Sequence, residues 1–175
     1  MSCSDRRSLL AALAALPLVA AGCGFAPAHG PGGAAQGMHG RIRADDPQSG
    51  EEFDFVDRLE ERLGRPEGAR FALAYTITTE REGLARTADR RDSRGQITGR
   101  VDFELRALSA EDENAAPLTS GTVTAFTGHS ATATPLADRA AAEDAQRRLM
   151  RMLADRVISR LTATAGDWNA AAGTR

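Results

Sequence analysis

The segment Ile97-Thr98-Gly99-Arg100-Val101-Asp102-Phe103-Glu104-Leu105-Arg106 has the most regular hydrophobic pattern in the chain. Bulky apolar residues occupy one set of alternate positions, interrupted only by Gly99, and polar or charged residues occupy the other set. Successive side chains of a strand point to opposite faces, so this alternation predicts a strand with one buried face and one solvated face. Such strands are typical of antiparallel sheets.

The flanking sequence predicts three further strands. Residues 71–78 alternate large apolar residues with Ala and Thr, and residues 118–127 are rich in Thr and Val, which favour strands. Residues 41–44 are a candidate for a short first strand. The charged stretch 89–95 lies between two predicted strands, and we expect it to be a loop.

Two amphipathic helices are predicted, one before and one after the three main strands in the sequence. Ser49 is a candidate N-cap, and Gly64 followed by Pro66 ends the first helix. The second helix covers residues 136–164. The apolar stripe of the first helix consists of Val56, Leu59 and Leu63, extended by Phe53 or Phe55, and that of the second consists of Leu149, Leu153, Val157 and Leu161.

The order of these elements predicts an α+β fold. Successive strands joined by short connections pair as a meander, and both amphipathic helices must cover the same apolar face of the sheet. We therefore expect a two-layer sandwich, with two helices packed on one face of a mainly antiparallel four-stranded sheet.

The N-terminus has the features of a lipoprotein export signal. Arg6 and Arg7 precede an apolar run over residues 9–21, and Cys23 follows small residues at a cleavage point. The run is shorter than the roughly 20 apolar residues that a membrane-spanning helix needs. Cys23 is therefore predicted to be lipidated, and two or three acyl chains form a stable membrane anchor. The paired arginines leave both the general and the twin-arginine export routes open.

The chain divides into four predicted parts. Residues 1–22 form the signal, residues 23–40 form a Gly- and Pro-rich flexible tether, residues 41–165 form the α+β domain, and residues 166–175 form a disordered tail. The net charge of −2 argues against nucleic-acid binding, which requires a clustered basic excess. Cys23 is the only thiol left after cleavage, so no internal disulfide is expected.

No arrangement of residues in the sequence indicates catalysis, a metal site or a bound cofactor. The three histidines have no His or Cys partner at metal-ligand spacing. Asp102 and Glu104 are two residues apart and imitate a carboxylate pair. We interpret them instead as solvent-side charges that alternate with Arg100 and Arg106 along the strand and pair across strands. The chain is therefore not expected to be an enzyme.

An arginine cluster surrounds the predicted hairpin between the second and third strands. The members of the cluster that lie just before the third predicted strand or within it are Arg90, Arg91, Arg94 and Arg100. The planar guanidinium group suits phosphate recognition, so these residues are candidates for binding a phosphorylated lipid. The alternative is that they are solvated and balanced by nearby acidic residues.

The segment Cys23-Gly24-Phe25-Ala26-Pro27-Ala28-His29-Gly30 resembles the stretch that follows the lipidation site in the LptE family of lipopolysaccharide-assembly lipoproteins. His29 stands where the family usually has an aromatic residue. The order of helices and strands also agrees over nearly all of the mature chain. The fold that the resemblance implies, helices on a four-stranded sheet, matches the fold expected from the residues.

The resemblance implies a non-enzymatic role at the outer membrane, on its periplasmic side. Family members lie inside an outer-membrane β-barrel of the LptD type, assist its assembly and plug it, and the pair delivers lipopolysaccharide to the outer leaflet. It further implies that lipopolysaccharide is a ligand, bound through basic residues. Those residues of the family do not align individually with this chain, so Arg90, Arg91, Arg94 and Arg100 are candidate contacts by their position alone. The alternative from another class is an auxiliary lipoprotein of a lipid-transporting ABC system.

Overall fold

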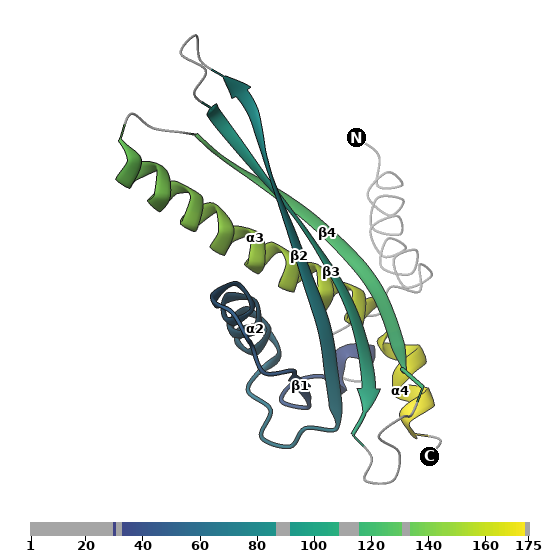
Figure 1. Cartoon of the computed structure of the whole chain (residues 1–175). Helices are drawn as coiled ribbons and strands as arrows, with labels where there is room; N and C mark the ends of the chain where they lie inside the picture. Colours follow the sequence, from purple (N-terminus) through teal and green to yellow (C-terminus); the bar gives the residue numbers. More distant parts are fainter. Residues whose placement is uncertain (1–29, 31–32, 87–91, 109–115, 131–133, 174–175) are drawn as a thin grey trace, which may run out of the picture.

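Four strands and two long helices form the core of the computed structural model, which describes residues 30, 33–86, 92–108, 116–130 and 134–173 (Figure 1). The elements in chain order are η1 (Ala34–Gly37), β1 (Ile42–Ala44), α2 (Gly50–Leu63), β2 (Phe71–Arg86), β3 (Asp92–Ala107), β4 (Thr119–Ser130), α3 (Pro135–Ala163) and α4 (Ala165–Gly173). Helices pack on one face of the mainly antiparallel sheet, so the predicted α+β sandwich is confirmed.

The sheet has the strand order β1-β2-β3-β4. β2, β3 and β4 form an antiparallel meander, as expected. The candidate strand at residues 41–44 is confirmed as β1, which pairs parallel with β2 and places Ile42 opposite Phe71. The pairing is parallel because the connection contains α2, and a crossover of this length returns the chain in the same direction.

β2 and β3 extend well beyond their apolar segments. The two strands remain paired as far as Arg86 and Asp92, and β4 follows β3 as far as the pair of Arg94 and Ser130. The prediction of a loop over residues 89–95 is therefore wrong for residues 92–95, and residues 89–91 lie outside the described residues. Strand pairing uses only backbone groups, so charged side chains do not end a ribbon that has solvent on its faces.

α2 begins and ends at the residues that the sequence indicated. The hydroxyl of Ser49 accepts a hydrogen bond from the backbone N–H of Glu52 at 3.2 Å, and Gly64 has a φ of 80°, which favours glycine. Of the two candidate phenylalanines, Phe55 is fully buried, whereas Phe53 is 62% exposed.

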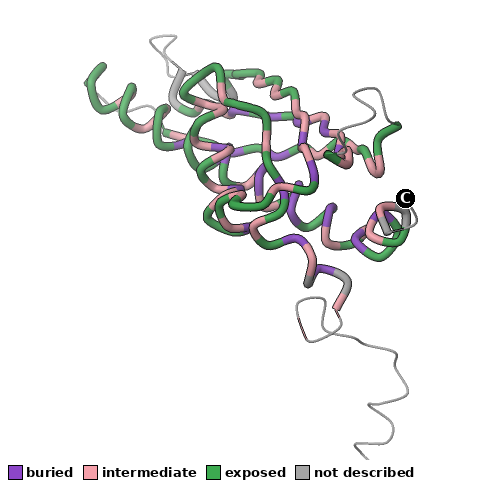
Figure 2. Tube along the Cα trace, turned by 90° about the horizontal axis from the view of Figure 1, so that it is seen from below, coloured by how far each residue is buried: buried purple, intermediate pink, exposed green. Residues whose placement is uncertain are grey.

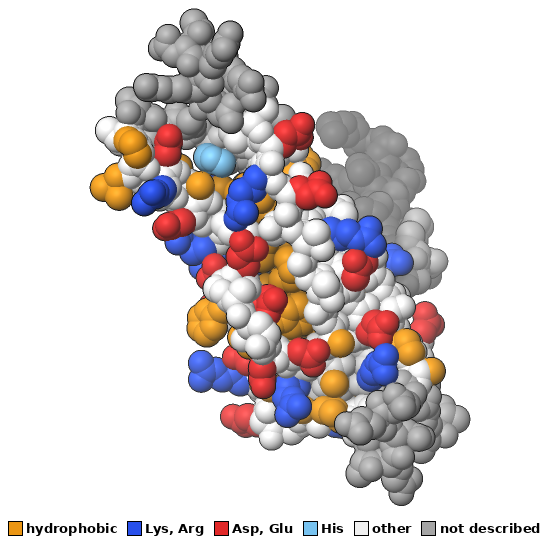
Figure 3. Space-filling model, viewed as in Figure 1, with side chains coloured by type: hydrophobic (Ala, Val, Ile, Leu, Met, Phe, Trp, Pro, Cys, Tyr) orange, Lys and Arg blue, Asp and Glu red, His pale blue; other side chains and the backbone are white. Residues whose placement is uncertain are grey.

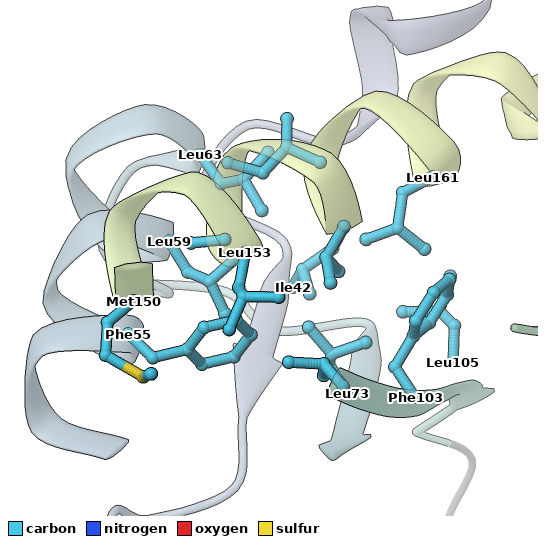
Figure 4. Packing of buried hydrophobic residues seen from close by; sticks show 14 of the residues in the cluster. Ile42, Phe55, Leu59, Leu63, Leu73, Phe103, Leu105, Met150, Leu153 and Leu161 are labelled. Atoms are coloured by element: carbon cyan, nitrogen blue, oxygen red, sulfur yellow. The ribbon is translucent and has the colours of Figure 1, made fainter. Parts of the chain in front are cut away.

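The two helices and the sheet share one apolar core. The predicted stripe of α3 is confirmed, because its four leucine and valine side chains are all fully buried. Figure 4 shows side chains of α2 and α3 pointing toward one another and toward Ile42, Leu73 and Phe103 of the sheet. Buried positions gather where the helices face the strands, whereas the start of α3 projects beyond this region and is exposed (Figure 2).

Gly99 allows α3 to approach β3 closely. A Cβ atom at this position would lie 2.7 Å from Cδ1 of Leu153 and 3.1 Å from Cδ2 of Leu149, and both leucines are fully buried. The gap that Gly99 makes in the apolar pattern of β3 is therefore filled by leucines from the helix. Any side chain at residue 99 would have to displace these leucine side chains or move α3 away from the sheet.

The predicted disordered tail over residues 166–175 is wrong for the described part, because Ala165–Gly173 form α4. Trp168 is fully buried, its Nε1–H donates to the carbonyl of Leu161 at 3.1 Å, and its ring meets that of Phe71 edge-on at 5.0 Å. Part of the predicted tether also packs on the domain, since Ala35 and Met38 are buried. One large aromatic side chain thus anchors a segment that is otherwise small and polar.

Trp168 provides a direct test of this arrangement because it is the only tryptophan in the chain. We expect its fluorescence to have the blue-shifted emission of an indole in an apolar site. Trp168→Ala should lower the free energy of unfolding by about 3–5 kcal/mol, since it removes a fully buried aromatic. The exposed neighbour provides the control, and Asp167→Ala should change stability little. Emission of a solvated indole would show that α4 is not docked.

Candidate functional site

The face of the sheet opposite the helices is left open by the described residues. We call it the outer sheet face, formed by Thr76, Thr78, Arg100, Asp102, Glu104, Arg106, Thr122, Thr124 and Phe126. A shallow hollow of about 580 Å³ lies on this face, and Asp102, Glu104 and Thr122 are among the residues that line it. Apart from Phe126, which is 66% exposed, these side chains are polar or charged.

A three-residue network occupies the centre of the outer sheet face. Arg100 donates two hydrogen bonds to the carboxylate of Asp102, at 2.9 and 2.7 Å. Arg100 also contacts the hydroxyl oxygen of Thr122 on β4 at 3.1 Å, and this hydroxyl donates to Asp102. This bidentate contact fixes the plane of the guanidinium group, and bidentate pairing is the strongest geometry for an arginine and a carboxylate.

This network changes the acid–base properties of its members. Hydrogen bonds from Arg100, and then from Thr122, lower the pKa of Asp102 below its ordinary value of 3.8. The same hydrogen bonds to Asp102 raise the pKa of Arg100. The carboxylate therefore stays ionised and paired at all ordinary pH values, so Asp102 is a poor general acid or base.

The second pair of the face is formed in the same way. Arg106 contacts Glu104 at 2.8 Å. The prediction that these residues are paired charges on the solvent side is therefore correct. Its geometry is wrong, because both ion pairs run along β3 instead of across strands. Residues two apart on one strand lie on the same face about 7 Å apart, within reach of a long arginine side chain.

The structure describes two of the four candidate arginines, and it does not bring those two together. Arg90 and Arg91 lie outside the described residues. Arg94 and Arg100 are both on the solvent side of β3, but six residues of strand separate them by about 20 Å. Arg100 is also committed to Asp102. Among the candidates in the described part of the chain, Arg94 is exposed and forms no ion pair with a described residue, whereas Arg100 pairs with Asp102.

Arg81, in the same hairpin, faces the helices. It donates hydrogen bonds to Glu51 of α2 at 3.2 Å and to Gln146 of α3 at 3.1 Å, and so joins both helices to β2. Arg58 of α2 similarly binds Asp155 of α3 through two hydrogen bonds of 3.1 Å. Arg81 therefore links the helices to the sheet, and Arg58 links α2 to α3 within the helix layer.

Sequence reasoning missed a second basic position on the opposite side of the sheet. Arg156 and Arg160 of α3 line a groove of about 480 Å³ together with Thr122, Val123 and Thr124 of β4. The i, i+4 spacing of these arginines is visible in the sequence. Their position beside β4 depends on how α3 crosses the sheet, which the sequence pattern does not specify.

The described part of the chain offers little for catalysis or metal binding. Within it, no group of three or more His, Cys, Asp and Glu side chains is close enough to hold a metal ion. No described helix has the length and hydropathy needed to span a bilayer. Acidic and basic side chains are interspersed on the face seen in Figure 3, without an extended patch of one sign.

The fold is that of an α+β domain with helices on one face of the sheet and a polar, open face on the other. The model of the LptE family, described as lipopolysaccharide-assembly, matches residues 41–161. The match includes all four strands, α2 and nearly all of α3, and the chain belongs to this family. The predicted family resemblance is thereby confirmed, and the protein is a member of a family of lipopolysaccharide-assembly lipoproteins.

Solved structures share the fold at low sequence identity. A putative lipoprotein from Caulobacter crescentus is 21% identical with a TM-score of 0.61, covering 78% of this chain and 98% of that one. Rare lipoprotein B from Shewanella oneidensis is 15% identical with a TM-score of 0.53, covering 71% and 93%. A minor lipoprotein from Acinetobacter baumannii is 16% identical with a TM-score of 0.51, covering 71% and 90%. A comparison with curated protein sequences gave no significant match.

The network at Asp102 predicts a defined pH dependence. The pKa of Asp102 in the folded state lies below the unfolded value of about 3.9. The contribution of this carboxylate to the stability of the fold is therefore fully present above the unfolded value. It is lost as the pH falls through the folded pKa. We expect the carboxyl carbon of Asp102, followed by NMR, to titrate below the ordinary range, and Arg100→Gln to move the titration upward. Arg94→Gln, on the same face, should leave it unchanged. An ordinary pKa in the unaltered protein would refute the network.

Proposed function

We propose that this protein is an outer-membrane lipoprotein, anchored on the periplasmic side through lipid on Cys23. In this role it assists assembly of the lipopolysaccharide-export β-barrel of the LptD type, plugs its lumen and takes part in delivering lipopolysaccharide to the outer leaflet. The observation that carries the proposal is the family match, which spans the four strands, α2 and nearly all of α3.

The physical character of the domain supports a position inside a barrel. The lumen of an outer-membrane barrel is polar, in contrast to its lipid-facing surface. The outer sheet face is polar as well, and its strongest charges are neutralised in pairs by Arg100 with Asp102 and Arg106 with Glu104. Such a surface makes hydrogen bonds to a polar wall without bringing an unpaired charge into the contact.

A pull-down from membranes tests the proposed partnership. We expect a tagged full-length chain, extracted in mild detergent, to co-purify with an outer-membrane barrel of far greater mass. Depletion of the chain should reduce the amount of folded barrel. As a control, Cys23→Ala removes the anchor and should release the domain from the membrane fraction.

Two outcomes would contradict the partnership. The first is recovery of the chain alone, with barrel folding unaffected by its depletion. The second is recovery with an ATPase or a substrate-binding protein, which would indicate an auxiliary lipoprotein of a lipid-transporting ABC system.

The proposed lipopolysaccharide contacts are the hairpin arginines, Arg90, Arg91, Arg94 and Arg100. Of these, Arg94 and Arg100 lie in the described part of the chain, and both are exposed. Changing Arg90, Arg91 and Arg94 together to Ser should weaken lipopolysaccharide binding by about tenfold or more, because charge-assisted contacts to phosphate are lost. Arg100 should contribute less, since Asp102 already occupies its guanidinium group.

A matched triple variant controls for net charge. Arg41, Arg43 and Arg70 are exposed near the opposite end of β2, about 50 Å away along the strand. Changing these three residues to Ser should leave lipopolysaccharide binding within about twofold of the unaltered chain. Equal loss in the two triple variants would show a general charge effect, and no loss in either would exclude the hairpin arginines.

A further inference from the structure

β4 forms an edge of the sheet and contains none of the residue types that usually protect an edge strand. It pairs with β3 on one side, and no other described strand pairs with its second side. Its 12 residues contain no Asp, Glu, Lys, Arg or Pro (Figure 1). Edge strands of soluble domains usually carry such residues, because exposed N–H and C=O groups otherwise pair with a strand of another chain.

The opposite edge of the same sheet is protected in the expected way. β1 has only three residues, one of them Arg43. Where β2 continues beyond β1 it carries Glu80, Arg81 and Glu82. The difference between the two edges indicates that β4 is left open for pairing, since this chain does protect the edge at which pairing would be unwanted.

α3 runs beside the open edge in the opposite direction to β4. Arg148 donates a hydrogen bond to the carbonyl of Gly128 at 3.4 Å. Further along the helix, Nε of Arg160 lies 4.0 Å from the position that a Cβ on Gly121 would occupy. The helix therefore follows β4 over much of its length and forms one wall of the groove between them.

Arg156 and Arg160 give this wall a positive charge that nothing in the described chain neutralises. Both are exposed, and neither takes part in an ion pair of the described residues. The neighbouring carboxylate of Asp155 is engaged by Arg58 on the side of α2. By contrast, Arg147 and Arg148 share Asp144. The groove thus combines open backbone groups with two uncompensated cations.

We propose that the β4 edge and the Arg156–Arg160 pair form a docking groove for an extended acidic segment of a partner protein, which adds to the sheet as a fifth strand. Every second side chain of such a strand faces α3. These side chains are about 7 Å apart, and the two arginines are about 6 Å apart along the helix, so two acidic residues at i and i+2 match them. Backbone pairing gives affinity, and the charges select the segment.

The charges disfavour a second copy of this chain in the groove. Pairing of β4 with β4 of another molecule would bring four arginines close together, and β4 contains no acidic residue to offset them. The inference extends beyond the proposed function, because it concerns a different surface from the hairpin arginines. Its test does not require the barrel or lipopolysaccharide, so either proposal can fail without the other.

A designed peptide tests the groove with the full-length chain in detergent. The probe is a fluorescent nine-residue peptide that alternates Val and Thr and carries two Glu residues at i and i+2. We expect saturable binding, measured by anisotropy, and a loss of about tenfold when both Glu residues are replaced by Gln. Amide signals of Thr122, Val123 and Thr124 should shift in NMR spectra when the peptide binds.

Variants of the chain test the arginine pair without disturbing the edge. Arg156→Gln with Arg160→Gln should weaken peptide binding by about tenfold. Arg139→Gln with Arg151→Gln removes the same charge from exposed positions of the same helix outside the groove, and should have little effect. Equal effects of the two double variants would overturn the assignment of the arginines.

A third peptide separates strand addition from simple anion binding. N-methylation of alternate amides on the pairing side keeps both Glu residues but blocks backbone hydrogen bonds, and should abolish binding. If the methylated peptide binds as well as the parent, the groove does not add a strand. Full displacement of the parent peptide by inorganic phosphate would likewise reduce the groove to an anion site and overturn the proposal.

Discussion

The contact between α3 and β3 at Gly99 sets the geometry of the buried layer. Leu149 and Leu153 lie where a side chain of residue 99 would otherwise be, so the helix approaches the middle of the sheet closely. This position of α3 brings its stripe over β3, holds α2 alongside through Arg58 and Asp155, and places Arg156 and Arg160 beside β4. One missing side chain therefore influences both the core and the basic groove.

Much of the fold follows from local patterns in the sequence. The alternation around Val101 identified β3, the apolar spacing identified both long helices, and Ser49 and Gly64 marked the limits of α2. These features are visible because burial of one face imposes a period of two on strands and of 3.6 on helices. The prediction of a short β1 is also correct, although its parallel pairing depends on the crossover through α2.

The errors arose where a single contact or the backbone outweighed composition. The small residues after Ala165 indicated a disordered tail, yet the contact of Trp168 with Phe71 is enough to dock a helix there. The charged residues after Asp92 indicated a loop, yet backbone pairing continues through them. Likewise, Arg100 looked available for a ligand, and its pairing with Asp102 became evident only from the structure. Sequence spacing gives no information on which arginines are already satisfied.

Both described ends of the chain lie at the same end of the domain. η1 and α4 pack together there, beside Phe71 at the start of β2, and the paired ends at Arg86 and Asp92 lie at the other end (Figure 1). β2 alone spans about 50 Å, whereas a chain from Cys23 to Gly33 reaches at most about 35 Å. With Cys23 in the membrane as proposed, the far end of the β2–β3 hairpin can therefore lie at a distance from the membrane that residues 23–33 alone do not span. Under this proposal the length of β2 and β3, more than that of residues 23–33, sets how far the domain extends from the bilayer.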